Sequence, residues 1–210
     1  MKKTFLLRLT AFLVVAGTLA GLFLTTDVYE ETRSRIVEVL CLSCIKLEPK
    51  TVANFTFNTV NNVSHQPFII ENLTHGPIFI DYSENACDAC TQMHPIVARL
   101  FNVSFGEKEM FYAHVLFEQS NVTVMYINID NTTVERKNSR PIYDKDHIGG
   151  LPQFTIITLG NYDHGIVKPY YTSVYGLLNK PSDEQRYTFL RDLMEESIEM
   201  YNQNQAGFHP

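Results

Sequence analysis

Four cysteines carry the most definite chemistry in the sequence, and they form two pairs with the same spacing. The pairs are Cys41-Leu-Ser-Cys44 and Cys87-Asp-Ala-Cys90, and no cysteine is left over. Four cysteines in 210 residues are too few for a disulfide-rich scaffold. A C-x-x-C pair serves either thiol–disulfide chemistry or metal binding, so the surroundings of each pair decide its interpretation.

The second pair lies where a buried strand is predicted to run into a helix. The apolar run 77–82 predicts the strand, and the apolar spacing from Cys87 to Phe101 predicts the helix. A helix N-terminus stabilises a thiolate, because its free N–H groups and macrodipole favour negative charge. We therefore expect Cys87 to be the nucleophile and Cys90 to resolve the mixed disulfide. Asp88 opposes this effect, because it adds a negative charge beside Cys87.

The residues around this pair resemble the active-site segment of the thioredoxin family. Asp81 lies six residues before Cys87, and Pro95 lies five residues after Cys90, as the buried aspartate and the helix proline of that family do. The resemblance implies that Asp81 is a buried group that handles protons during catalysis. His94, four residues after Cys90, either tunes that thiol or is an ordinary surface histidine.

A second segment supports the same resemblance. Residues 150–152 (Gly-Leu-Pro) precede an apolar strand, as the cis-proline loop of the thioredoxin family does. The resemblance implies a cis peptide bond before Pro152, and it implies that the backbone of Leu151 is presented to the substrate. Gly176 is similar to a late glycine of the family, and the whole resemblance covers about residues 51–202.

Several positions depart from the family pattern. Ala86 stands where the family has a tryptophan, so an aromatic surface beside the thiol is lost, although we still expect Ala86 to contact the substrate. Asp88 and Ala89 replace the usual glycine and proline, Gln153 replaces a common threonine, and residues 102–120 resemble an insertion. The pattern therefore does not distinguish an oxidant from a reductant or an isomerase.

The role of Cys41 and Cys44 stays open. They form a second redox pair, a static disulfide, thiols linked to a lipid or a partner, or half of a four-cysteine zinc site with Cys87 and Cys90. The 42 residues between the pairs exceed the usual zinc-ribbon gap, and an oxidising compartment disfavours zinc thiolates. We favour a second redox-active or regulatory pair for Cys41 and Cys44, and we predict no metal site.

Residues 1–26 have the features of a membrane anchor or a signal segment. Basic residues precede or edge an apolar run from Leu9 to Leu24, and acidic residues follow it. The length of the run and the lack of an A-x-A cleavage pattern favour an uncleaved single-pass anchor. The charge asymmetry places the rest of the chain outside the cytoplasm. Residues 27–50 are predicted to form a juxtamembrane helical segment that carries Cys41 and Cys44.

The number of N-x-S/T sequons is consistent with an extracytoplasmic location. There are more of them than an Asn- and Thr-rich composition alone predicts, and each is an acceptor for glycosylation only on an exposed, translocated segment. The six sequons begin at Asn54, Asn62, Asn72, Asn102, Asn121 and Asn131.

Strands and helices are predicted to alternate over residues 51–205. This alternation predicts an α/β domain with a central mixed sheet flanked by helices, and the resemblance implies that the fold is thioredoxin-like. Residues 102–120 are assigned to neither type. The predicted strands are 54–59, 77–82, 122–129, 153–159 and 164–173; the predicted helices are 66–73, 87–101, part of 132–147, and a last helix that begins at the capping box Ser182-Asp-Glu-Gln185.

The composition disfavours some classes of function and is compatible with the thiol–disulfide chemistry that the motifs predict. The formal net charge is −6 and basic residues form no long runs, which disfavours a nucleic-acid partner. We expect a protein disulfide oxidoreductase that needs no cofactor. Its partners would be protein thiols and disulfides, the membrane through the N-terminal helix, and a membrane electron donor or acceptor. The alternative is a redox-inert docking or chaperone module of the same fold.

Overall fold

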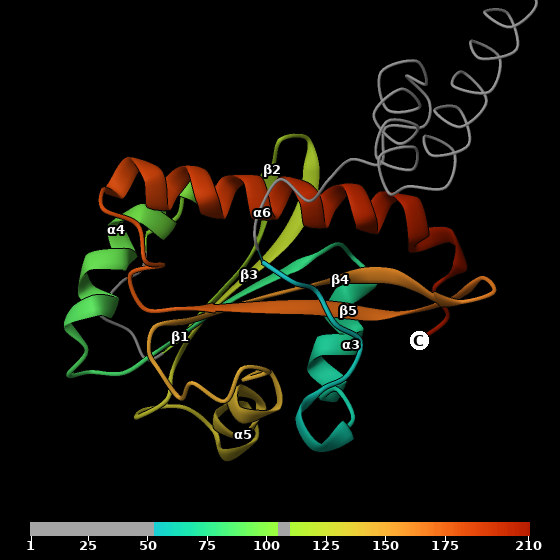
Figure 1. The fold of residues 1–210 in the computed structure, drawn as a ribbon, viewed down its shortest axis with the longest axis horizontal. Helices are drawn as coiled ribbons and strands as arrows, with labels where there is room; N and C mark the ends of the chain where they lie inside the picture. Colours follow the sequence, from blue (N-terminus) through green and yellow to red (C-terminus); the bar gives the residue numbers. More distant parts are fainter. Residues whose placement is uncertain (1–52, 105–109) are drawn as a thin grey trace, which may run out of the picture. The chain divides into compact units, whose positions relative to one another are not determined.

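Helices cover both faces of a five-stranded mixed sheet (Figure 1). The structure is a computed structural model that describes residues 53–104 and 110–210. The predicted anchor at 1–26 and the predicted juxtamembrane segment at 27–50, with Cys41 and Cys44, lie outside the described residues. Within the described residues, no helix has the length and the apolar character needed to cross a membrane.

Strands and helices alternate along most of the chain, as the sequence predicts. The described elements are η1 (Val60–Asn62), α3 (Pro67–Leu73), β1 (Ile78–Ser83), α4 (Asp88–Phe101), β2 (Met110–Phe117), β3 (Ser120–Asn128), α5 (Val134–Ile142), β4 (Gln153–Asp163), β5 (Ile166–Tyr175), α6 (Asp183–Asn204) and η2 (Gln205–Gly207).

Strand β1 lies at the centre of the sheet. The strand order is β2-β3-β1-β4-β5, with β1 parallel to β3 and antiparallel to β4. The outer pairs, β2 with β3 and β4 with β5, are antiparallel. The prediction of a central mixed sheet flanked by helices is therefore confirmed, as is the edge position of the strand predicted near residues 164–173.

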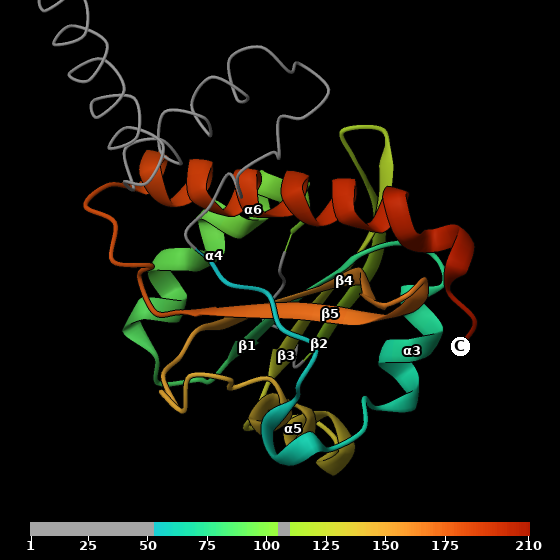
Figure 2. The same ribbon diagram turned by 45° about the vertical axis from the view of Figure 1, so that its right-hand side comes forward.

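The two faces of β1 contribute to two different hydrophobic cores. Ile78, Ile80 and Tyr82 pack on the face that is covered by α3 and α5, whereas Phe79 packs with α4 and α6 on the other face. Figure 2 shows these helix pairs on opposite sides of the sheet. Because side chains alternate along a strand, Asp81 points to the same face as Phe79, towards α4.

Local sequence signals explain where the helices begin. Pro67 occupies the first turn of α3, where its missing N–H group costs no hydrogen bond. Ser182 caps α6 by accepting a hydrogen bond from the Gln185 backbone N–H at 3.3 Å, which confirms the predicted capping box. Cys87 is the N-cap of α4, so the predicted helix start at the second cysteine pair is also confirmed.

One predicted strand is wrong, and one strand lies in a segment for which the sequence predicts no element. Residues 54–59 form no ladder, and only Thr56 pairs with another strand, through one isolated bridge to Tyr171. Their alternating aromatic residues instead pack on β5, since Phe55 and Phe57 stack on Tyr170. The segment 102–120, which was assigned to no element, contains the edge strand β2.

Candidate active site

The second cysteine pair forms a disulfide at the start of α4. The S–S distance between Cys87 and Cys90 is 2.08 Å. Cys87 is half-buried, and its sulfur accepts a hydrogen bond from the Cys90 backbone N–H at 3.0 Å. Cys90 is only 1% exposed. Of the two sulfurs, Cys87 is therefore the one in the more accessible residue, in agreement with the roles expected from the sequence. Asp88, the first residue of α4, is exposed.

Polar side chains attach the loop before Cys87 to the end of β3. The Asn85 backbone N–H donates to Asp130 Oδ2 at 2.9 Å, and Asn128 Nδ2 donates to Asn85 Oδ1 at 2.7 Å. Asn131 Nδ2 also lies 3.4 Å from Asn85 Oδ1. These contacts fix the backbone that leads into the disulfide. No local sequence pattern predicts these contacts, because the residues that they join are 43 or more positions apart.

The cis-proline loop lies at the same end of the sheet as the disulfide loop. The Leu151–Pro152 bond is cis, which confirms the prediction. Gln153 pairs with Tyr82 near the end of β1, so the residues before Gln153 lie beside the residues that follow β1. Leu151 is half-buried and Ala86 is exposed, so both are available to contact another molecule.

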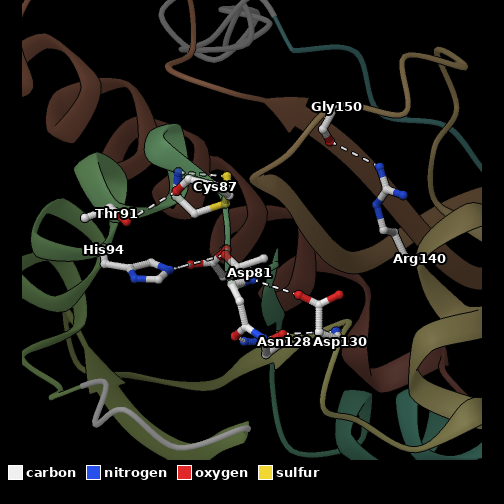
Figure 3. Close-up of a disulfide and its surroundings, with 11 residues drawn as sticks. Asp81, Cys87, Thr91, His94, Asn128, Asp130, Arg140 and Gly150 are labelled. Carbon is white, nitrogen blue, oxygen red and sulfur yellow. Dashed lines mark hydrogen bonds and ion pairs between the residues drawn. A yellow bond between two sulfur atoms is a disulfide. The ribbon is translucent and has the colours of Figure 1, made fainter.

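Two hydrogen bonds fix the backbone of the cis-proline loop. The Gly176 backbone N–H donates to the Pro152 carbonyl at 2.8 Å. Arg140 Nη2, from α5, donates to the Gly150 carbonyl at 3.3 Å (Figure 3). Gly176 has a positive φ of 59°, a conformation that glycine adopts without a steric penalty. The late glycine noted in the sequence thus positions Pro152, whereas the role of Arg140 was not predicted.

Asp81 is a fully buried carboxyl group on the face of β1 that α4 covers. Ser83 Oγ donates a hydrogen bond to Asp81 Oδ1 at 2.8 Å. The other oxygen, Oδ2, has no hydrogen-bond partner among the described residues and lies 3.8 Å from His94 Nε2 (Figure 3). Burial raises the pKa of Asp81 from 3.8 to about 7, and the bond from Ser83 opposes this shift only in part. The carboxyl group therefore exchanges a proton near neutral pH.

His94 connects Asp81 to the surface of the domain. It follows Cys90 by four residues, so the two side chains lie on the same side of α4. The His94 side chain is 28% exposed, and its Nε2 atom lies 3.2 Å from Ser83 Oγ. Its ring packs edge-on against Tyr126 of β3 at 5.1 Å between centroids. Partial burial lowers the pKa of His94.

Comparisons with known proteins assign no function to this chain. No protein-family model, no curated protein and no solved structure matched the chain. The chemistry must therefore be inferred from the residues themselves.

The arrangement around Cys87 and Cys90 is suited to reversible disulfide exchange. Cys87 and Cys90 are bonded to each other, and among residues 53–104 and 110–210 no three metal-binding side chains gather at one place. A half-buried sulfur at a helix N-terminus favours a thiolate, and a buried carboxyl with a pKa near neutrality can accept or supply the proton of a neighbouring thiol.

Proposed function

We propose that this protein is a membrane-anchored thiol–disulfide oxidoreductase with a thioredoxin-like fold, which acts on exported protein substrates through Cys87 and Cys90. One observation carries the proposal: a C-x-x-C disulfide caps a helix that packs over a fully buried aspartate. A disulfide that served only to stabilise the fold would not need a buried carboxyl group on that face of the sheet, because a buried charge is costly.

The reaction begins at the more accessible sulfur. A substrate thiolate attacks Cys87 Sγ, the bond between Cys87 and Cys90 breaks, and Cys90 leaves as a thiolate that takes up a proton. The second substrate thiol loses its proton to solvent and attacks the substrate sulfur in the mixed disulfide, which releases Cys87 as a thiolate. Two electrons pass from the substrate dithiol to the protein. The reverse sequence reduces a substrate disulfide.

The exposed residues around the disulfide provide a surface for an extended protein segment. Ala86 precedes the nucleophile, and the backbone of Leu151 lies in the loop that Arg140 and Gly176 fix. Ile148, which is 58% exposed, adds an apolar contact near this loop. A substrate segment that is disordered or locally unfolded fits this surface, because its backbone is free to pair with that of Leu151.

A docking module of the same fold is the second candidate function. The exposed apolar side chain of Ile148 is compatible with partner binding of this kind. Such a module would hold its partners without exchanging electrons, and so it would keep them after the cysteines are replaced. The buried Asp81 favours the oxidoreductase, because a docking surface has no use for a proton acceptor behind the disulfide.

The reduction potential of the Cys87–Cys90 pair tests the proposal. Catalytic pairs have potentials between about −270 and −120 mV, whereas structural disulfides lie below about −300 mV. We expect the full-length protein, equilibrated in glutathione buffers and trapped with an alkylating reagent, to show a potential in the catalytic range. A variant with Cys41→Ser and Cys44→Ser isolates the second pair. A potential in the structural range would contradict an oxidoreductase.

The proposed extracytoplasmic location predicts glycosylation at exposed sequons and not at Asn72. Asn72 is buried, and its side chain bonds to the Phe68 carbonyl and to the Tyr112 hydroxyl, so a glycan there would disrupt the fold. The five remaining asparagines are exposed.

Glycopeptide mass spectrometry of the protein from its native source should therefore find glycans at one or more exposed sequons and none at Asn72. Asn72→Gln serves as the control and should leave the glycan mass unchanged. An unmodified intact mass, together with protection from protease added outside the cell, would contradict the proposed location.

A further inference from the structure

The buried Asp81 carboxyl needs a route for its proton, and the packing around it leaves few candidates. Asp81 is 0% exposed on the central strand of the sheet. Its direct neighbours in the ladder are Tyr126 on β3 and Phe154 on β4. Phe154 carries no titratable group, and burial raises the pKa of Tyr126, with the charge of Asp81 adding to that shift. Phe154 therefore passes no proton, and the Tyr126 hydroxyl is hydrogen-bonded to Asn128.

Two polar residues lie between the Asp81 carboxyl and solvent. Ser83 Oγ is 2.8 Å from Asp81 Oδ1 and 3.2 Å from His94 Nε2, so its hydroxyl contacts both groups. His94 is the partly exposed member, at 28% of its side chain. The polar side chains next to Asp81 are therefore Ser83 from β1, His94 from α4 and Tyr126 from β3. Cys90 lies one turn before His94 on α4.

The two hydrogen bonds that join Asp81, Ser83 and His94 can reverse their direction, so that donor and acceptor exchange roles. When Asp81 is ionised, the Ser83 hydroxyl donates to the carboxylate, and it accepts the N–H of His94 Nε2. When Asp81 is protonated, the carboxyl donates to Ser83, and the Ser83 hydroxyl donates to an unprotonated His94 Nε2. A proton moves from one end to the other when both bonds switch together, and no heavy atom has to move.

We propose that Asp81, Ser83 and His94 form a proton wire through which the buried carboxyl exchanges its proton with solvent during disulfide exchange. The proposal rests on the proposed function. Ser83 and His94 are positioning residues in this scheme, since they act on the sulfurs only through Asp81.

The proton wire supplies the proton that the buried Cys90 thiolate takes up when the disulfide is reduced. When a substrate dithiol reduces the disulfide, Cys90 leaves as a thiolate and takes the proton of the Asp81 carboxyl. The Asp81 carboxylate regains a proton from Ser83, which takes one from His94, and His94 takes one from solvent. The Cys87 thiolate takes up the second proton from solvent, so the two protons lost by the substrate thiols match the two gained by the protein. Oxidation runs the same transfers backwards.

The unpaired oxygen of Asp81 fits its place in the wire. Asp81 Oδ1 is occupied by Ser83, whereas Oδ2 has no hydrogen-bond partner among the residues that the structure describes. Oδ1 therefore accepts the hydrogen bond of the wire, whereas Oδ2, 3.8 Å from His94 Nε2, has no hydrogen bond within the described part of the chain that would hold its proton in place. Burial raises the pKa of the Asp81 carboxyl to about 7 and lowers the pKa of His94, so Asp81 can both take up and release a proton near neutral pH.

The rate of disulfide exchange tests the wire. Dithiothreitol serves as the reductant for the full-length oxidised protein, and rates are measured from pH 5.5 to 8.5. General acid–base catalysis contributes about 10²–10⁴-fold, and solvent can replace part of it. We expect His94→Gln and Ser83→Ala each to slow exchange about tenfold at pH 7. His164→Gln is the matched control, because that histidine is 94% exposed and lies outside the site.

Three further readouts separate a wire from a structural role. The double variant should be no slower than either single variant, since both break the same path. Added imidazole should restore the rate of His94→Ala, and Ser83→Thr, which keeps the hydroxyl, should retain the wild-type rate. Rates of His94→Gln that match those of His164→Gln at every pH, or losses that add in the double variant, would overturn the proposal.

An NMR titration tests the proton wire separately from the proposed oxidoreductase function on which it rests. The His94 ring resonances should show a second inflection from Asp81 in the oxidised wild type, and Asp81→Asn should remove it. A single inflection that Asp81→Asn leaves unchanged would overturn the wire even if exchange is rapid. If the wild type exchanges no faster than an unstructured C-x-x-C peptide, the proposed function fails, whatever the titration shows.

Discussion

Replacing Cys87 with serine should abolish disulfide exchange with protein substrates, a loss of several orders of magnitude. A serine hydroxyl neither forms a disulfide nor ionises at neutral pH, so the variant has no nucleophile at the N-terminus of α4. Cys87 is also the half-buried member of the pair, and Cys90 at 1% exposed is too enclosed to be attacked in its place. The measurement is the rate of reduction of a disulfide-containing protein by the prereduced full-length chain.

Replacing Cys90 should have a different outcome. In Cys90→Ser the nucleophile remains but the mixed disulfide cannot be resolved, so covalent adducts should accumulate on Cys87. Non-reducing gels followed by peptide mapping detect them, and Cys87→Ser treated in parallel is the matched control. Adducts that form on Cys90 in the Cys87→Ser variant would show that the two roles are reversed. A docking module would instead retain its partners in both variants without covalent bonds.

Asp81→Asn should make the oxidised protein more stable at pH 8 and have little effect on its stability at pH 4. The folded state holds the Asp81 proton up to a pKa of about 7, whereas the unfolded chain loses it near 3.8. The contribution of this group to stability is therefore fully present below pH 3.8 and is lost as the pH rises to about 7. The shift corresponds to roughly 4 kcal/mol, which an asparagine does not lose.

Urea unfolding of the oxidised protein at pH 4, 6 and 8 tests this expectation. The difference in unfolding free energy between Asp81→Asn and wild type should grow with pH by a few kcal/mol and then level off above pH 7. Asp88→Asn removes an exposed carboxylate from the same region and should change stability by less than about 0.5 kcal/mol. If the unfolding free energies of Asp81→Asn and wild type differ by the same amount at all three pH values, burial does not hold the Asp81 carboxyl in its protonated form.

The parts of the site that the sequence predicts are those encoded by short spacings. The helix start at Cys87 follows from a handful of neighbouring residues, the cis bond before Pro152 is implied by the resemblance of residues 150–152 to a family loop, and the structure confirms both. The contact of His94 with Ser83 was not predicted, because it joins a strand to a helix across 11 positions. Such contacts depend on tertiary packing, which a local pattern does not encode.

The missed strand β2 has a specific physical cause. β2 and β3 are joined by a two-residue turn at Glu118 and Gln119, and both residues have positive φ, 45° and 69°. Turns of this kind are usually marked by asparagine or glycine, which adopt positive φ most easily. Glutamate and glutamine are not typical of such turns, so the sequence does not predict a hairpin between residues 102 and 120.

The central position of β1 also affects how the site responds to thermal fluctuation. β1 pairs on both sides, with β3 and β4, whereas within the described part of the chain β2 has one neighbouring strand and the outer edge of β5 has only the isolated bridge to Thr56. Amide hydrogen exchange is slowest where a strand opens only when the whole domain unfolds. Because β1 is paired on both sides, we expect the backbone amides of Asp81 and Ser83 to be among the slowest to exchange. Solvent therefore should not reach the Asp81 carboxyl group through transient local opening of β1. We therefore expect the proposed disulfide exchange to take place in the native state, without local opening of the sheet.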